Sequence, residues 1–460
     1  MGNYKTVNTK YATAGTKVKT NKFRSFLGAH FPIIGVLMGV LLVAASTGTY
    51  TNWDAQLEFQ AAQSVVTRGF PYVTTGLMIN QPPLGFYMDA PVFHAFGLSY
   101  LNGIGVATAF GLGSVALIYA LGTLLYGKRT GLVAAALFGI VPWHVYISRI
   151  FLIDNQSLFF SLIFLVVGVL AVRKNSQKLL AAAGVFFAIA LMTKLFAVFM
   201  LIPLLLIILL KQKDHGFKLS PRNLLIFVAP TIVLQAVWFG VFANQNFFGV
   251  YFSSDITHPV LVADPSPLFL PIVLVKSAGW FLFAAGLFSL ALTIAYRKIL
   301  TKMVWLDVVC VGTVAAVAAL DLFLVFGLHL TVPYVSVFKY NYYALPFYCL
   351  LAASLATKGS TLISSTDWKK KSSLVKPALV GVGVALLFSS LLESTIFLLK
   401  WVGFASFGVD TVTYYPFDVF SPPLSSYFVP FHYAGTILIV FSLILPFTIM
   451  GVKRILLRRT

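Results

Sequence analysis

Long apolar runs alternate with short polar segments along the whole 460-residue chain. About twelve of the runs approach the 20 or so residues that an α-helix needs to cross the hydrocarbon core of a bilayer. They lie near residues 30–48, 100–125, 131–147, 155–172, 179–192, 195–210, 222–243, 268–295, 303–328, 340–357, 375–399 and 433–451. The fifth and sixth runs are short and could form one kinked unit. The pattern therefore predicts an all-α polytopic membrane protein of about twelve transmembrane helices.

The composition favours the same class. Hydrophobic residues make up 59% of the chain and charged residues 10%, and the mean hydropathy is +0.90. Soluble globular domains are not that apolar. A net charge of +20 could indicate a nucleic-acid partner, but Lys and Arg gather between the apolar runs, so we expect a bilayer and no nucleic acid. Cys310 and Cys349 both lie in apolar runs, which argues against a disulfide framework.

The basic residues also predict an orientation. If the N-terminus is inside, the cytoplasmic segments are residues 1–29, 127–130, 173–178, 211–222, 297–302, 358–376 and the C-terminal tail, and these hold most of the 33 Lys and Arg residues. Such a bias fixes the orientation of a membrane protein strongly. We therefore expect both termini in the cytoplasm and residues 1–29 to form a basic cytoplasmic tail.

Most acidic residues fall on the other face, in external segments of which 49–99 and 400–432 are the longest. Asp321 and Glu393 lie within apparent spans. A transporter would more often place its ionisable groups near the midplane of the bilayer. This distribution indicates a site at the extracytoplasmic face. The aromatic side chains of 400–432 either anchor the chain at the interface or cover a sugar or lipid-linked substrate.

The stretch from Asn52 to Tyr87 contains the first candidate residues. Asp54 and Glu58 are four residues apart, so on a helix they would share a face and could serve a general base, a metal ion or hydrogen bonds to a polyol. Asp54 could instead cap a helix. Further on, Gln81 precedes Pro82 and Pro83, and consecutive prolines fix the backbone and prevent a helix from starting earlier.

Three later elements each place isolated charges near the same face. Arg149 and Asp154 are the only charges between the third and fourth runs, and they could form a structural ion pair. Lys194 lies where two short apolar runs meet and could equally be a snorkelling lysine. A third element, from Lys339 to Pro346, leads into the tenth run.

Taken in this order, the elements resemble the GT-C glycosyltransferases, in particular the group of protein O-mannosyltransferases and aminoarabinose transferases. The matching positions are Asp54, Pro82-Pro83-Leu84-Gly85, Arg149 with Asp154, Thr193-Lys194, and Tyr343 with Pro346, and the resemblance spans about residues 30–355. Three positions depart from the family pattern. Ala55 follows Asp54 where the family often has Glu, Asn80-Gln81 replace Glu-Lys before the prolines, and Tyr342 stands where Arg is common.

The resemblance implies a GT-C-like module over residues 30–357 with its external loop at 49–99, followed by a C-terminal membrane part over 358–460. It also implies a polyprenyl-phosphate sugar donor and an acceptor hydroxyl on a protein, a lipid or a glycan. Inverting transfer would use Asp54 as general base, and Asp154, the second catalytic residue, would orient a cation or bind sugar hydroxyls. The substrate-binding residues would be Glu58, Gln81, Pro82, Pro83, Arg149, Lys194, Lys339 and Tyr343.

No cofactor is required by this reading, although a divalent metal ion held by Asp54, Glu58 and Asp154 is compatible with it. Two other classes stay open at this stage. Twelve spans with both termini inside also suit a secondary transporter or a lipid flippase, and the single acid at the first motif suits a membrane scaffold without catalysis.

Overall fold

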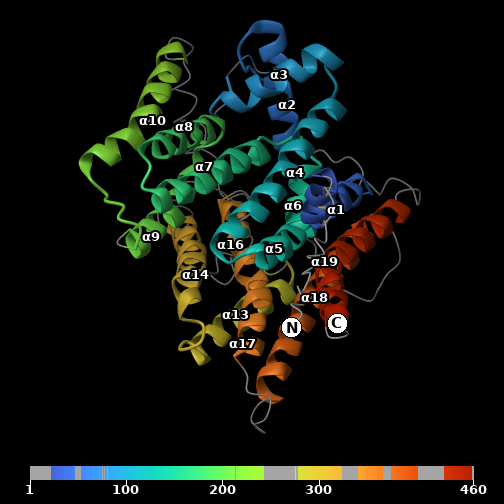
Figure 1. Cartoon of the computed structure of the whole chain (residues 1–460). Helices are drawn as coiled ribbons and strands as arrows, with labels where there is room; N and C mark the ends of the chain where they lie inside the picture. The colour runs from blue at the N-terminus through green and yellow to red at the C-terminus, as the bar shows by residue number, and fades with distance from the viewer. Residues whose placement is uncertain are drawn as a thin grey trace, which may run out of the picture.

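The structure is a computed structural model that describes residues 22–46, 53–74, 76, 78–79, 81–212, 214–242, 275, 278–323, 340–365, 374–401 and 429–457. Helices dominate this part of the chain (Figure 1), and its only β contact is a single bridge between Tyr72 and Met78. The all-α class predicted from the sequence is therefore confirmed.

The helices run in chain order as α1 (Lys22–Ser46), α2 (Trp53–Arg68), α3 (Leu84–Phe96), α4 (Tyr100–Leu125), α5 (Lys128–Ile140), α6 (Pro142–Ser148), α7 (Asp154–Lys174), α8 (Gln177–Thr193), η1 (Leu195–Met200), α9 (Leu201–Lys211), α10 (Pro221–Phe242), α13 (Trp280–Ala295), α14 (Thr301–Leu322), η4 (Asn341–Ala344), α16 (Leu345–Ala353), α17 (Leu355–Ser364), α18 (Val375–Trp401) and α19 (Val429–Leu457). Each of the predicted apolar runs coincides with one or more of these helices, at least in part.

Six described helices, α4, α7, α10, α14, α18 and α19, are long and apolar enough to cross a membrane. The number rises to seven if α5 and α6, which are bent by 64° relative to each other, form one broken span. Four shorter apolar helical stretches lie at His30–Ser46, Gln177–Thr193, Leu195–Lys211 and Trp280–Ala295. The chain is an integral membrane protein of this helical type, and the count of twelve spans stays a prediction.

Two breaks in the helices place candidate residues. Val141 is extended because the residue before a proline is driven away from helical angles, so α6 starts afresh at Pro142 with all of its residues buried. Lys194 is also extended, with φ −157° and ψ 131°, and it separates α8 from η1. The fifth and sixth apolar runs are therefore two units, with Lys194 at the joint between them.

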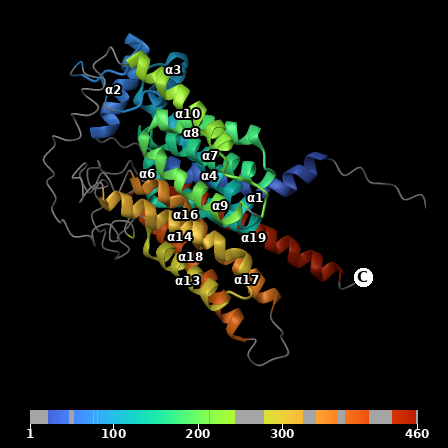
Figure 2. The same cartoon turned by 90° about the vertical axis from the view of Figure 1, so that its left-hand side faces the viewer.

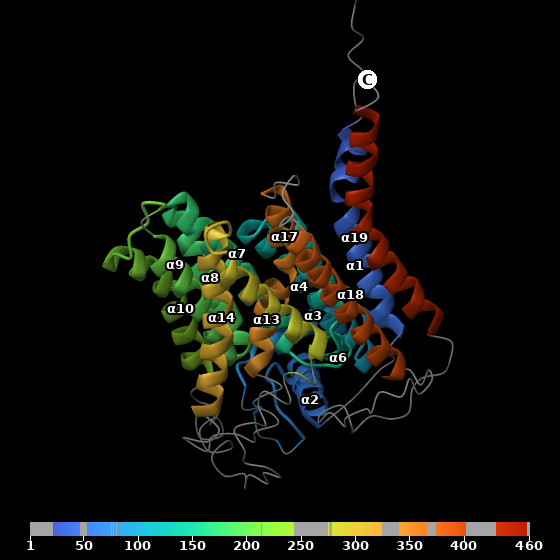
Figure 3. The same ribbon diagram turned by 90° about the horizontal axis from the view of Figure 1, so that it is seen from below.

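Helices α1 and α19 form an antiparallel pair along one edge of the molecule (Figure 3). Ser46, at the end of α1, hydrogen-bonds His432 near the start of α19 at 3.1 Å. A Cβ atom added to Gly39 would lie 2.6 Å from the carbonyl oxygen of Gly435, so only glycine allows this crossing. Small residues at such contacts let membrane helices approach closely. The described ends of the two helices at Lys22 and Leu457 therefore lie on the same side.

The segment predicted to be the first external one contains two helices, α2 and α3, at the end of the molecule opposite the C-terminal end of α19 (Figure 2). Helix α3 starts directly after Pro82 and Pro83, as the proline pair predicts. Beneath the two helices lies a small apolar core that includes Val65, Phe86 and Phe151. This core fixes the external helices against the chain that leads into α7.

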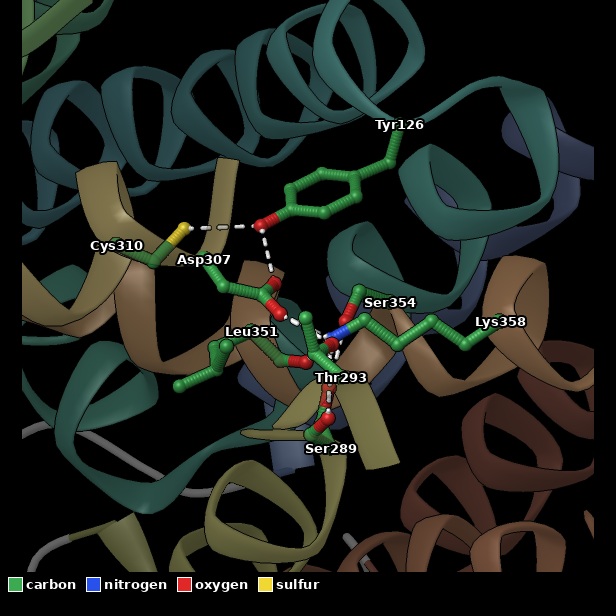
Figure 4. Close-up of polar contacts among 8 residues, drawn as sticks. All are labelled: Tyr126, Ser289, Thr293, Asp307, Cys310, Leu351, Ser354 and Lys358. Atoms are coloured by element: carbon green, nitrogen blue, oxygen red, sulfur yellow. Dashed lines mark hydrogen bonds and ion pairs between the residues drawn. The ribbon is translucent and has the colours of Figure 1, made fainter. Parts of the chain in front are cut away.

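One assignment made from charge is wrong. Lys358 was expected in a cytoplasmic loop over 358–376, but it lies in α17 with its side chain fully buried. Its Nζ is 2.7 Å from Asp307 Oδ2 and donates to the backbone oxygen and the hydroxyl of Ser289 (Figure 4). Thr293 and Tyr126 donate to the two oxygens of Asp307. The lysine is thus part of a buried network that joins α4, α13, α14 and α17.

Candidate active site

The first turn of α7, with Ile153 just before it, is hydrogen-bonded to residues of α2, α3, α4, α6, α8 and η4. The backbone amide of Ile153, the residue before the helix, donates to Glu58 Oε2 of α2 at 2.9 Å. The side chain of Gln156 donates to Asp89 Oδ1 of α3 at 2.7 Å. Asn155 and Ser157 are bonded to the carbonyl oxygens of α4 and α8 residues and to side chains of α6 and η4. Five consecutive residues, 153–157, therefore collect the polar contacts of the site.

Lys194 lies between two carboxylates at this turn. Its Nζ is 2.5 Å from Asp154 Oδ2 and 3.9 Å from Glu58 Oε1. All three side chains are buried, with residue exposures of 3% for Lys194 and 0% for both acids. The N-terminus of α7 adds positive potential that favours the two carboxylates. The structure thus brings together Glu58, Asp154 and Lys194, which the sequence singled out separately.

The other oxygen of the Asp154 carboxylate has no hydrogen-bond partner in the described structure, although it is buried. Buried polar atoms are nearly always hydrogen-bonded, so an open acceptor of this kind calls for a specific explanation. One oxygen of Asp154 is held by Lys194, which leaves Oδ1 able to accept a hydrogen bond from a hydroxyl group.

A second set of contacts holds Asn155. Its amide nitrogen donates to Ala107 O of α4 at 3.1 Å and to Ser148 Oγ of α6 at 3.0 Å. Its amide oxygen accepts from the hydroxyl of Tyr342 at 2.7 Å. The same hydroxyl is 2.7 Å from Nδ1 of His144. These side chains are uncharged or only weakly basic, so the distribution of charge along the sequence did not point to them. The sequence analysis named only Tyr342, as a position where the family often has Arg.

Tyr343, which the resemblance assigns to substrate binding, is fully buried. Its hydroxyl donates to Ser157 Oγ at 2.8 Å, and Ser157 in turn donates to the carbonyl of Ala190 in α8 at 3.2 Å. In this structure the tyrosine ties η4 to α7 and α8. Any contact of Tyr343 with a substrate stays a prediction.

Asp89 is a buried acid that the sequence analysis did not assign to the site. It lies one helical turn after Gly85, whose missing side chain leaves room for Gln156, because a Cβ atom there would lie 3.0 Å from Gln156 Oε1. Burial raises the pKa of the Asp89 carboxyl well above its usual range, the Gln156 hydrogen bond opposes this shift, and the charge of Glu58 adds to it. The signal that could have found it is an acid four residues after a glycine in an otherwise apolar helix.

The structure gives the burial of most of the remaining candidates. Asp54, in the first turn of α2, and Arg149, after the last residue of α6, are both half-buried and both have polar interactions. Gln81 is half-buried, and the two prolines after it are buried. Lys339 lies outside the described residues. The pair Asp54 and Glu58 do share α2, as predicted, but Glu58 is the more deeply buried of the two.

A metal site is not assembled by the described residues. Among them, no three His, Cys, Asp or Glu side chains are grouped so that they could hold a metal ion. The ion that the sequence allowed with Asp54, Glu58 and Asp154 would have to compete with Lys194 for two of its three ligands. Metal dependence stays a matter for experiment.

Comparisons with known proteins find one matching family model. The family model for dolichyl-phosphate-mannose-protein mannosyltransferase matches residues 80–239. That range starts at the proline segment and includes α7 and Lys194. A search of curated protein sequences finds no match.

Solved structures share the fold at low sequence identity. ArnT from Cupriavidus metallidurans bound to undecaprenyl phosphate superposes with a TM-score of 0.55 and 13% identity, covering 91% of this chain and 78% of ArnT. The apo state of the same ArnT gives a TM-score of 0.56, 13% identity, and coverage of 90% and 78%.

The archaeal oligosaccharyltransferase AglB from Archaeoglobus fulgidus, in complex with an inhibitory peptide and a dolichol-phosphate, gives a TM-score of 0.51 and 14% identity. The match covers 83% of this chain and 57% of AglB, so this chain spans little more than half of that protein. Taken together, the family match and the shared fold confirm the resemblance of this chain to the GT-C membrane glycosyltransferases.

Proposed function

We propose that the protein transfers a sugar from a polyprenyl-phosphate donor to an acceptor hydroxyl at the extracytoplasmic face of the membrane, with inversion at the anomeric carbon. The observation that carries the proposal is the buried group of Lys194, Asp154 and Glu58 at the start of α7. It occurs within a fold shared with ArnT bound to undecaprenyl phosphate and AglB in complex with a dolichol-phosphate.

Asp54 is the general base of this proposal. It is the half-buried acid of the site, whereas Glu58 and Asp154 are buried and engaged with Lys194. Asp54 takes the proton of the acceptor hydroxyl, and the acceptor oxygen forms the new bond to the anomeric carbon. The bond between that carbon and the phosphate oxygen breaks, and polyprenyl phosphate leaves with the electron pair. A base in this role must lie within hydrogen-bond reach of the hydroxyl.

Asp154 has two tasks in the same scheme. One oxygen holds Lys194 in place at 2.5 Å. The other, Oδ1, accepts a hydrogen bond from a hydroxyl of the bound sugar and so satisfies the open acceptor. The negative charge that develops on the leaving phosphate needs nearby cations. Lys194 and Arg149 are the candidates among the described residues, and Lys339 is a third candidate outside them.

Two independent features support the proposed side of the membrane. Lys and Arg concentrate in the segments that would face the cytoplasm, which predicts the termini there. Helices α2 and α3 lie at the end of the molecule opposite the C-terminal end of α19, and α2 carries Asp54 and Glu58. Together they favour an extracytoplasmic site.

The test uses membranes that contain the full chain and a polyprenyl phosphate carrying tritiated mannose, followed by a panel of other labelled sugars. We expect acceptor-dependent transfer of label, and we expect Asp54→Asn to lower it by about 10² to 10⁴, the range for losing a general base. Asp214→Asn is the matched control, because Asp214 is an exposed acid paired with Lys211 away from the site. Full transfer by Asp54→Asn would refute its role, and uptake of label without covalent transfer would favour a transporter.

A further inference from the structure

Tyr342 is a fully buried residue to which the proposed reaction gives no task. It lies in η4 directly before Tyr343, where the family pattern often has an arginine. Its ring is stacked near the ring of His144, with centroids 6.2 Å apart and an angle of 14° between the planes. Its hydroxyl lies between His144 Nδ1 and Asn155 Oδ1, 2.7 Å from each.

The hydrogen bonds around Asn155 fix the direction of each donor. Both amide protons of Asn155 are used, one by Ala107 O and one by Ser148 Oγ, so its oxygen faces Tyr342. The Tyr342 hydroxyl must therefore donate to Asn155. Its single proton is then used, so its oxygen accepts a hydrogen bond from His144 when the imidazole proton is on Nδ1. The result is a directed chain from α6 through η4 to α7.

This chain acts on the residue next to Asp154. Asn155 is anchored in three directions, by α4, α6 and η4, and these anchors fix the rotation of the first turn of α7. The direction in which Asp154 leaves the helix depends on that rotation. Lys194, by contrast, is held separately at the end of α8. The short contact between Asp154 and Lys194 thus requires α7 to be set correctly.

We propose that Tyr342 is a positioning residue of the active site: through Asn155 it sets the first turn of α7 and thereby directs Asp154 toward Lys194 and the donor sugar. The proposal rests on the proposed function for its catalytic consequence. The phenol of Tyr342 also brings no positive charge into the site. In this chain residue 342 therefore orients the first turn of α7, and Lys194 and Arg149 supply the positive charge.

The experiment compares Tyr342→Phe with the wild-type full chain in lipid nanodiscs. Phe keeps the ring and removes one buried hydroxyl with two hydrogen bonds, and we expect kcat for transfer from the labelled polyprenyl-phosphate sugar to fall about tenfold. KM for the donor should change less than kcat, because the substitution removes no group that contacts the donor and only alters the direction of Asp154. Tyr348→Phe is the matched control, since Tyr348 is a half-buried tyrosine of α16 with no hydrogen bond in the described structure.

A second measurement does not depend on turnover. Amide hydrogen exchange should rise in the peptide that covers residues 150–160 of Tyr342→Phe and stay unchanged in the α1 and α19 peptides, because local opening follows the loss of local hydrogen bonds. Asn155→Leu should reproduce both effects, and the double variant should be no worse than the more impaired single variant, because the two residues act through one contact.

Wild-type kcat in Tyr342→Phe, or additive losses in the double variant, would overturn the proposal. So would a rise in exchange that spreads through the whole chain with a lower melting temperature, since that describes a general packing residue. If the wild type transfers no label from any donor tested, the proposed function fails. The exchange measurement still decides in that case whether Tyr342 sets the first turn of α7.

Discussion

Two buried lysines in this protein are each paired with an aspartate, yet the two pairs are built differently. Lys194 pairs with Asp154 beside the α2 and α3 end of the molecule, and Lys358 pairs with Asp307 near the other end of α4. Ala107, close to the first pair, and Tyr126, which touches the second, are about 30 Å apart along α4.

The second pair is complete. Lys358 Nζ contacts Asp307, the hydroxyl of Ser289 and the backbone oxygen of Ser289, so its three protons are all used. Both oxygens of Asp307 accept further hydrogen bonds, from Tyr126 and Thr293. Every charge and polar atom has its partner within the chain. A buried pair with such a shell has nothing left with which to bind a ligand.

The first pair is incomplete. Lys194 shares its charge between Asp154 and Glu58, the second at 3.9 Å, and Asp154 Oδ1 has no hydrogen-bond partner in the described structure. A buried acceptor without a hydrogen bond lowers the stability of the folded protein, because its lost contacts with water are not replaced. The pair at Lys358 is thus satisfied within the protein, while the pair at Lys194 leaves one acceptor open, which the proposed function assigns to a substrate hydroxyl.

The largest effect on stability should come from Lys358→Met. Removing the ammonium group leaves the Asp307 carboxylate buried without its cation, which costs about 3–5 kcal/mol. We expect a clear fall in the melting temperature of the purified full chain in detergent. Lys298→Met, at an exposed lysine, is the control and should melt like the wild type. An unchanged melting temperature in Lys358→Met would show that the network of Figure 4 does not fasten the helices.

The next effect should appear in activity. We expect Asp154→Asn to lower sugar transfer by about 100-fold, or about 2.7 kcal/mol of transition-state stabilisation. Stability should fall less than in Lys358→Met, because Glu58 stays beside Lys194 as a second carboxylate. Transfer and melting temperature are measured on the same preparations. If Asp154→Asn lowered the melting temperature but left sugar transfer normal, the roles assigned to the two pairs would be wrong.

Replacing both members of a pair separates the roles further. Lys358→Met combined with Asp307→Leu removes both charges, and apolar replacements of buried pairs are often neutral, so we expect stability to return to within about 1 kcal/mol of the wild type. Transfer should return with it. The equivalent replacement of Lys194 and Asp154 should leave transfer abolished however well the chain melts. Recovered transfer in that second variant would contradict a catalytic site at α7.

The spans could be predicted because hydropathy is a property of each segment alone. Thus α4, α7 and α10 coincide with predicted runs to within a few residues. The residues Asp154 and Lys194 were also visible, since each is an isolated charge at the edge of an apolar run. Their pairing was not, because the residues are 40 positions apart and several external charges could have taken either place.

The burial of a polar residue could not be predicted where it lies inside the helix bundle without an apolar run on both sides. Lys358 is followed by Gly359 and Ser360, which gave its surroundings the character of a loop, and its partner Asp307 is 51 positions away. Asn155, His144 and Tyr342 are neutral or aromatic residues that apolar helices also contain for packing. Their hydrogen-bonded chain depends on the contact of α6, α7 and η4, and only the fold creates that contact.

Asp89 gives the last and smallest test, as a buried acid that has no ion-pair partner in the described structure and accepts a hydrogen bond from Gln156. Its pKa is raised in the folded protein, mainly by burial and further by the charge of Glu58. Folding therefore favours the protonated acid. Its contribution to stability is fully present below the usual pKa of aspartate, near 3.8, and is lost as the pH rises toward the folded pKa.

Asp89→Asn mimics the neutral acid and keeps an acceptor for Gln156, so the variant should lose this pH dependence. We expect the difference in the free energy of unfolding between Asp89→Asn and the wild type to grow above pH 4 by no more than about 1.4 kcal/mol per pH unit. Sugar transfer should be retained. Asp89→Leu removes the acceptor and should be less stable than Asp89→Asn at every pH. If Asp89→Asn instead loses transfer, the Asp89 carboxylate takes part in the reaction. Asp89 would then belong to the active site together with Asp154, although no lysine pairs with it in the described structure.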